Sequence, residues 1–256
     1  MAWYRGDLHV HSARSHGGEM SPARVVAAAR DAGLDFIAVT EHNTTDTYAE
    51  FAALAGDDLL VIPGREVTTG NGHWLTLGPD ALRVAAHPFA PYPGGALRHR
   101  FGEFDAIEVW NGAWRSDLPW QADNEAALQA WGATGAAVPA VGNSDTHLEG
   151  QIGTPQTVVR AEELSAAGVL AAVRAGRCWI AGSAAVDLSF TARPGAVRFA
   201  VRGVPGGILS LHSERGEVLR AAASDAVEWR GEAAFVRAEV RHPDGAMAAL
   251  TNPVPA

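Results

Sequence analysis

The chain has 256 residues, of which 47% are hydrophobic and 19% charged; this is enough apolar material for a sizeable core and excludes a disordered protein. The formal net charge of -9 argues against a surface that binds nucleic acids or anionic membranes in general, but leaves anionic substrates open. All 20 basic residues are arginine and Cys178 is the single cysteine, which excludes Schiff-base lysine chemistry, an internal disulfide and a cysteine-cluster zinc site.

The first 183 residues alternate short apolar runs with amphipathic stretches, a pattern typical of α/β domains. Strands are expected at residues 7–11, 36–40, 59–63, 73–77, 83–86, 106–109 and 138–141. Helices are expected at residues 22–33, 46–55, 119–131 and 162–175, the first with Ser21 as its N-cap and Pro22 at its first position. Repeated βα units of this kind predict a barrel or a doubly wound sheet.

The pattern changes after residue 183, where apolar and polar residues alternate between Gly, Pro and Asp punctuation. This predicts two parts: a domain over residues 1–183 and a small antiparallel β unit over residues 184–256 that packs on it. No apolar run is long enough for a membrane helix, and the N-terminal residues lack the apolar region of a signal peptide. We therefore expect a cytoplasmic protein with no membrane partner, and the sequence leaves its oligomeric state open.

Seven of the ten histidines fall at or just after the ends of predicted strands. They are His9, His11, His16, His42, His73, His87 and His147, and they are joined by two carboxylates, Glu66 and Asp145. Because the carboxyl ends of parallel strands share one face of a barrel, these nine side chains are expected to converge. Imidazole and carboxylate ligands suit Zn, Mn or Fe, and nine ligands are too many for one ion, so the pattern predicts two to three divalent ions.

Six strings resemble the polymerase-and-histidinol-phosphatase (PHP) superfamily of metal-dependent phosphoesterases: DLHVHS, GLDFIAVTEHNT, GREVTT, GHWLTLG, AAHP and GNSDTH. They occur in the family's order between residues 7 and 147. Within the superfamily, residues 21–44 look most like the branch that includes carbaryl-type carbamate hydrolases. The resemblance implies a distorted (β/α)7 barrel with a trinuclear site at its C-terminal strand ends.

The resemblance also implies how the ligands divide among three ions. The first ion would use His9, His11, Glu66 and Asp145. The second would share Glu66 and add His73 and His87, and the third would use His16, His42 and His147. Many members have Asp at position 16; histidine there is a neutral ligand, which favours zinc or iron over harder ions.

In the mechanism that we hypothesise, a water bridging two ions is acidified and attacks phosphorus, while the third ion binds a substrate oxygen. Arg65, Asn111 and Arg115 are the candidate catalytic residues, because they adjoin Glu66 or lie in the loop after the strand at 106–109. Trp110 and Trp114 of that loop could form an apolar wall of the pocket or simply pack in the core. Asp7 and Glu41 could orient ligating imidazoles or could face away from them.

The sequence thus predicts a metal-dependent phosphoesterase that hydrolyses phosphate mono- or diesters. A carbamate or carboxyl ester hydrolase using the same site is the alternative among enzymes, and a non-catalytic accessory binding module is the alternative outside them. The partner is expected to be a small phosphorylated or ester substrate, with a short oligonucleotide as a further option.

Overall fold

The computed structural model describes all residues 1–256. The helices are α1 (Pro22–Asp31), α2 (Tyr48–Ala55), α3 (Asn124–Ala133), α4 (Ala166–Arg174) and the short 3-10 helix η1 (Phe101–Glu103). The strands of the N-terminal part are β1 (Ala2–Val10), β2 (Phe36–Val39), β3 (Leu60–Thr69), β4 (Gly72–Leu77), β5 (Leu82–Ala86), β6 (Ala106–Asn111), β7 (Ala140–Asn143), β8 (Gln156–Ala161) and β9 (Cys178–Ala181). The later strands are β10 (Asp187–Arg193), β11 (Ala196–Arg202), β12 (Ile208–Ser213), β13 (Gly216–Ala222), β14 (Val227–Arg230), β15 (Phe235–Arg241), β16 (Met247–Thr251) and β17 (Val254–Pro255).

One long sheet runs through both parts of the chain, in the order β13-β12-β15-β16-β9-β8-β1-β2-β3-β4-β5-β6-β7, with β17 paired to β15. Its parallel pairs are β1/β2, β2/β3, β5/β6 and β6/β7. The sheet curls so that β7 comes back beside β1: the Leu8 backbone N–H donates to Asn143 Oδ1 at 3.0 Å, and that of His11 to the Thr146 carbonyl at 3.2 Å.

The fold is therefore mixed α/β, as expected, but the expected (β/α)7 barrel is not confirmed. The chain has four α-helices, and strand pairing between β1 and the segment after β7 is reduced to one isolated bridge, Val10 with Thr146. The helix count falls short because β3, β4 and β5 follow one another as antiparallel neighbours, with turns in place of crossover helices.

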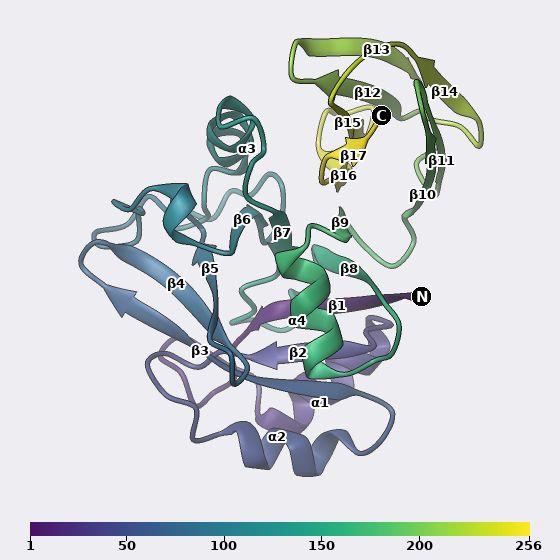
Figure 1. The fold of residues 1–256 in the computed structure, drawn as a ribbon. Helices are drawn as coiled ribbons and strands as arrows, with labels where there is room; N and C mark the ends of the chain where they lie inside the picture. The colour runs from purple at the N-terminus through teal and green to yellow at the C-terminus, as the bar shows by residue number, and fades with distance from the viewer.

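The helices cover both faces of the parallel strands (Figure 1). The sequence of β2 is continuously apolar because both faces of this strand are buried. Phe36 and Ala38 pack in one core cluster with α4, while Ile37 and Val39 pack in another with α1 and α2. α1 begins as predicted, with the Ser21 side chain accepting from the Arg24 N–H at 3.3 Å. None of the helices has the length and apolar composition that a membrane crossing requires.

The antiparallel strands predicted after residue 183 are present and form the C-terminal β unit, at the upper right of Figure 1. The three-stranded sheet β10-β11-β14 packs on β12, β15 and β16 through side chains such as Phe199, Leu211 and Val240. Trp179 and Ala181 of β9 belong to the same core cluster, and β16 hydrogen-bonds to β9, so the two parts of the chain share a sheet and a core.

Several elements differ from the sequence expectation, and three of them bear on the site or the sheet order. β3 runs to Thr69 instead of ending near residue 63, so Glu66 lies inside a strand, paired with Leu75 of β4. α3 begins later than predicted, because the Asp123 side chain caps it by accepting from the Ala126 N–H at 3.0 Å. β8 was not predicted, and it joins β1 to β9.

Candidate metal centre

The predicted ligating side chains come from strand ends on one edge of the curled sheet. β1 carries His9, His11 follows that strand, and His42 follows β2. His87 comes directly after β5, and Asp145 lies two residues after β7. His87 and Asp145 have positive φ angles of 27° and 51°, which are uncommon for residues other than glycine and mark local strain at this edge.

Five imidazoles surround the carboxylate of Glu66, which is 1% exposed. Its Oε2 atom faces three Nε2 atoms, those of His9 at 3.4 Å, His11 at 3.3 Å and His42 at 3.1 Å. Its Oε1 atom faces two others, Nδ1 of His73 at 2.8 Å and Nε2 of His87 at 3.0 Å. One carboxylate thus presents each of its oxygens to a separate set of nitrogens, which is the arrangement expected of a ligand shared between two ions.

Asp145 completes the first set: its Oδ1 atom lies 3.3 Å from Nε2 of both His9 and His11. Three groups of ligand atoms result, each with its atoms within 4.8 Å of one another: His9, His11, Glu66 and Asp145; Glu66, His73 and His87; and His11, His42 and His147.

Buried atoms without a hydrogen-bond partner show that these groups fit metal ions. His9 Nε2, His11 Nε2 and Asp145 Oδ1 are all buried and unpartnered, and all three point into the first group. Leaving such atoms unsatisfied costs free energy, and a divalent cation would satisfy them together. Imidazole and carboxylate donors are the set that Zn, Mn and Fe accept.

Neighbouring acceptors fix which ring nitrogen faces the site. His9 Nδ1 lies 3.1 Å from Glu108 Oε1, and His147 Nδ1 lies 2.9 Å from the Asp145 carbonyl. In both residues Nδ1–H is the natural donor to these oxygens, which leaves Nε2 with its lone pair free. His11 Nδ1 has the Ser15 hydroxyl at 3.3 Å.

The electrostatics of the site favour positive charge. Burial alone would raise the pKa of Glu66, but the surrounding histidines, His9 and His11 foremost, hold this pKa well below its usual range. Burial alone would lower the pKa of His9, but Asp145, Glu108 and Glu66 raise it well above the ordinary value. Without metal, a proton on His9 thus balances the neighbouring carboxylates, and a bound cation would replace that proton.

Three other residues that the sequence singled out, His16, Arg65 and Arg115, are exposed. His16 lies outside the three groups, because it sits in an exposed turn at the rim of the cavity, and His11 takes its place in the third group. Arg65 is exposed, since it neighbours Glu66 on β3 and adjacent strand residues point to opposite faces. Arg115 is also exposed and donates to the Asp244 carbonyl at 2.6 Å. The prediction that these two arginines meet the substrate is therefore not supported.

Asn111 does line the cavity, and its Nδ2 lies 3.0 Å from Glu108 Oε2 and 3.3 Å from Asp145 Oδ2. Trp110 and Trp114 do not form a pocket wall; both are buried in the core, with ring centroids 5.0 Å apart.

Asp7 and Glu41 are both buried, and each contacts backbone groups or side chains next to the predicted ligands. Asp7 accepts from the backbone N–H groups of His9, Ser144 and Gly153 at 3.0–3.2 Å and so holds the turn after β7. Glu41 has an oxygen 3.9 Å from His11 Nδ1 and accepts from the Ser12 N–H at 3.3 Å.

Sequence reasoning missed Glu108, which contacts more of the site than either of these residues. The signal was present: Glu108 is the one charged residue of β6, AIEVWN, which is otherwise apolar up to Asn111 at its end, and all six residues are buried. A buried charge needs partners, so this position could have been identified as functional. Tyr92, Trp120 and Gln121, which line the cavity, lie in predicted loops or helix and gave no such signal.

The ligand groups open into a cavity of about 700 Å³ with 18 lining residues, a size suited to a small molecule.

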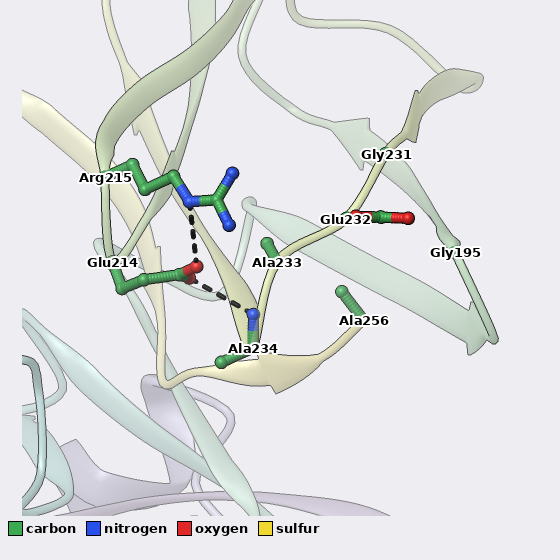
Figure 2. Close-up of a pocket in the computed structure, with 8 residues that line it drawn as sticks. All are labelled: Gly195, Glu214, Arg215, Gly231, Glu232, Ala233, Ala234 and Ala256. Carbon is green, nitrogen blue, oxygen red and sulfur yellow. Dashed lines mark hydrogen bonds and ion pairs between the residues drawn. The ribbon is translucent and has the colours of Figure 1, made fainter.

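A second hollow lies at the far end of the C-terminal β unit (Figure 2). There Glu214 lies 3.5 Å from Arg215 Nε and accepts from the Ala234 N–H at 3.2 Å, so two of its three ionisable groups satisfy each other. The chemistry of the chain is therefore concentrated at the first cavity.

The comparisons agree with this geometry. Residues 7–78 match the model of the PHP domain, and residues 123–178 match the PHP-associated model. The metal-ligating geometry and the PHP-domain match together indicate a metal-dependent hydrolase. No curated protein sequence matches the chain.

Solved structures of similar fold extend the comparison. A two-domain protein containing a predicted PHP-like metal-dependent phosphoesterase, from Bacteroides vulgatus ATCC 8482, is 18% identical with a TM-score of 0.59, over 99% of this chain and 95% of that one. PsfC from Pseudomonas syringae PB-5123 is 20% identical with a TM-score of 0.52, over 68% of this chain and 90% of that one. The lesion-specific endonuclease PfuEndoQ from Pyrococcus furiosus is 15% identical with a TM-score of 0.50, over 68% of this chain and 56% of that one. At these identities the likeness concerns the fold.

Proposed function

We propose that the chain hydrolyses phosphate mono- or diesters at a site of two to three divalent ions, Zn, Mn or Fe. The observation that carries this proposal is the Glu66 carboxylate between two sets of imidazoles, beside the unpartnered Nε2 atoms of His9 and His11. A phosphoryl group needs positioning and charge stabilisation more than covalent help from the protein, and such a site provides both.

The first ion would be held by His9, His11, Glu66 and Asp145, and the second by Glu66, His73 and His87. His42 and His147 would supply ligands to a third. When bound, the ions would acidify a water molecule for attack at neutral pH and neutralise charge on the ester oxygens.

The residues of the chain orient this site and limit what enters it. Glu108 holds the His9 ring through Nδ1 and binds the Asn111 amide, which in turn reaches Asp145. We further propose that residues 1–183 carry the catalytic unit and that residues 184–256 are its structural cover.

Hydrolysis of carbamates or carboxyl esters is the competing function. It is favoured by the resemblance of residues 21–44 to the carbamate-hydrolase branch and by the neutral side chains that line the outer cavity, among them Thr68, Gln121 and Gln151. A short oligonucleotide is the remaining candidate, and it would need its further phosphates to be bound outside this cavity.

The test is a metal-reconstituted protein assayed with p-nitrophenyl phosphate, bis-p-nitrophenyl phosphate, 1-naphthyl N-methylcarbamate and a short oligonucleotide, alongside elemental analysis. We expect two to three ions per chain and turnover of a phosphate ester that a chelator abolishes. The double variant His9→Ala, His11→Ala should lose both metal and turnover, while His242→Ala, outside the site, should keep both. Turnover that survives chelation, or a preference for the carbamate by orders of magnitude, would overturn the proposal.

A further inference from the structure

The cavity has two unlike halves. Its floor consists of the ligating groups around Glu66 and Asp145. The rest of its lining, here called the wall, includes the apolar or aromatic residues Ala90, Tyr92, Trp120, Ala122 and Leu148 and the neutral polar residues Thr68, Gln121 and Gln151, with His16 at the rim. A substrate that fills the cavity would thus place its reacting ester on the ions and its leaving group against an apolar, partly aromatic wall.

Trp120 is the largest side chain of this wall and it is 54% exposed. An exposed tryptophan at the mouth of a cavity leaves much of its ring available to a ligand, and indole stacks well on planar rings. The core does not need it, unlike Trp110 and Trp131, which are almost fully buried.

The backbone around Trp120 is held in place rather than free. The next residue, Gln121, donates from Nε2 to the Asn111 carbonyl at 2.5 Å, at the end of β6. The Gln121 amide lies where a Cβ at position 112 would come within 2.9 Å of it, so Gly112, at a φ of 59°, leaves the room that this bond requires. The anchor fixes the wall relative to Asn111 and hence to the metal ligands.

A second aromatic residue of the wall is Tyr92, in the loop after β5. Its ring lies over Gly95, where a Cβ would approach to 2.3 Å, and its hydroxyl lies 3.5 Å from His87 Nδ1. The Asp123 N–H donates to the Phe89 carbonyl at 3.2 Å, which joins the Tyr92 loop to the segment that carries Trp120. Two aromatic side chains from separate, hydrogen-bonded segments thus line one mouth of the cavity.

We propose that this mouth selects esters whose leaving group is a planar, uncharged aromatic alcohol, and that Trp120 is the residue that sets this specificity. The proposal rests on the proposed function, because the ester group is placed by the ions. Anionic extensions of the leaving group gain little from the wall, since the cavity is lined by no arginine and the polar members of the wall other than His16 are amides and hydroxyls.

The test measures binding of non-hydrolysable phosphonates to the metal-loaded protein by calorimetry, which separates recognition from leaving-group reactivity. The ligands are (1-naphthyl)methylphosphonate, cyclohexylmethylphosphonate, ethylphosphonate and 4-carboxybenzylphosphonate. We expect the naphthyl compound to bind the native protein tightest, and Trp120→Ala to weaken it roughly tenfold while changing ethylphosphonate less than about twofold. Trp120→Phe should retain most of the affinity.

Trp3→Ala is the matched control, because Trp3 is 41% exposed and packs on Phe190 instead of lining the cavity. It should leave every affinity unchanged. Unfolding temperatures of the Trp120 variants should stay close to the native value, since the side chain lies outside the core clusters.

Three results would overturn the proposal: unchanged naphthyl binding in Trp120→Ala, equal binding of the cyclohexyl and naphthyl compounds, or tightest binding of the carboxylated compound. Each leaves the hydrolase proposal intact as long as ethylphosphonate binding still needs metal. If instead no phosphonate binds in a metal-dependent way and no ester is turned over, the proposed function itself has failed.

Discussion

Glu108 shows how one buried side chain can organise a site without being a ligand. Its two oxygens accept from His9 Nδ1, the His87 backbone N–H and the amides of Asn111 and Asn143, at 2.8–3.1 Å. His9 and His87, two predicted ligands from different strands, are thereby both fixed to one carboxylate.

Replacing Glu108 with Gln should weaken metal binding about 10- to 100-fold, because the amide cannot accept with both of its ends and His9 loses its orienting anion. Competition with a chromophoric chelator measures this affinity. Glu103→Gln, an exposed carboxylate in η1, is the control and should bind metal like the native protein. Equal affinities in the two variants would show that Glu108 has no orienting role.

Cys178 is the residue whose chemistry the fold suppresses. It is 3% exposed, and burial raises the pKa of its thiol to about 12. Because the thiolate is the reactive form, only about one molecule in 10⁴ is ionised at pH 8. The native protein should therefore react with a disulfide reagent at pH 8 only as fast as it unfolds, and in denaturant at once; fast reaction of the folded protein would contradict the burial.

At the scale of elements, the short segment after β16 ties the two parts of the chain together. Asn252 accepts from the Ala140 N–H at 2.7 Å and donates to the carbonyls of Ala140 and Cys178 at 2.9 and 3.0 Å. The side chain of Asn252 thus makes the backbone hydrogen bonds at β7 and β9 that a neighbouring strand would otherwise make.

Asn252→Ala should lower the free energy of unfolding by about 1–3 kcal/mol, because it leaves buried backbone groups without partners. Denaturant titration followed by circular dichroism measures this loss. Asn71→Ala, at an exposed turn, should change the stability by less than about 0.5 kcal/mol. A neutral Asn252→Ala would mean that water replaces the lost bonds.

The elements that sequence predicted best are those that combine local signals. α1 has an N-cap and a proline, and β2 is a buried apolar run, so both stand where expected. β8 has only a short apolar run, TVV, and it forms because β1 and β9 flank it, which no local pattern reveals. β3 continues past Pro63 because β4 pairs with it, and this pairing is likewise a tertiary effect.

The same distinction holds for the site. Spacing predicted that imidazoles at strand ends would converge, and the structure brings eight of the nine expected ligands into three groups. It could not show that His16, Arg65 and Arg115 are exposed, because loop conformation and strand facing depend on packing. The wall of the cavity was missed for the same reason, since Trp120 lies in a segment whose position is set by hydrogen bonds to distant residues.

For the whole molecule, the shared sheet makes the C-terminal unit part of the fold. Deleting residues 184–256 should yield an insoluble product, because β9 would become an unpaired edge and Trp179 and Ala181 would lose their core cluster. The soluble fraction after expression measures this, with supply of residues 184–256 as a separate chain as the rescue control. A soluble, active fragment would instead make the unit accessory.

Metal should also stabilise the whole fold, because the ligands converge only in the native state. An ion at 1,000 times its dissociation constant adds about 4 kcal/mol by mass action, which corresponds to roughly 8–16 °C in the unfolding temperature of a chain of this size. Calorimetric scans of chelated and reconstituted protein measure the shift. Glu66→Gln should abolish most of it, since the shared carboxylate is lost, whereas His242→Ala should keep it. A shift of equal size in both variants would mean that the ions bind elsewhere.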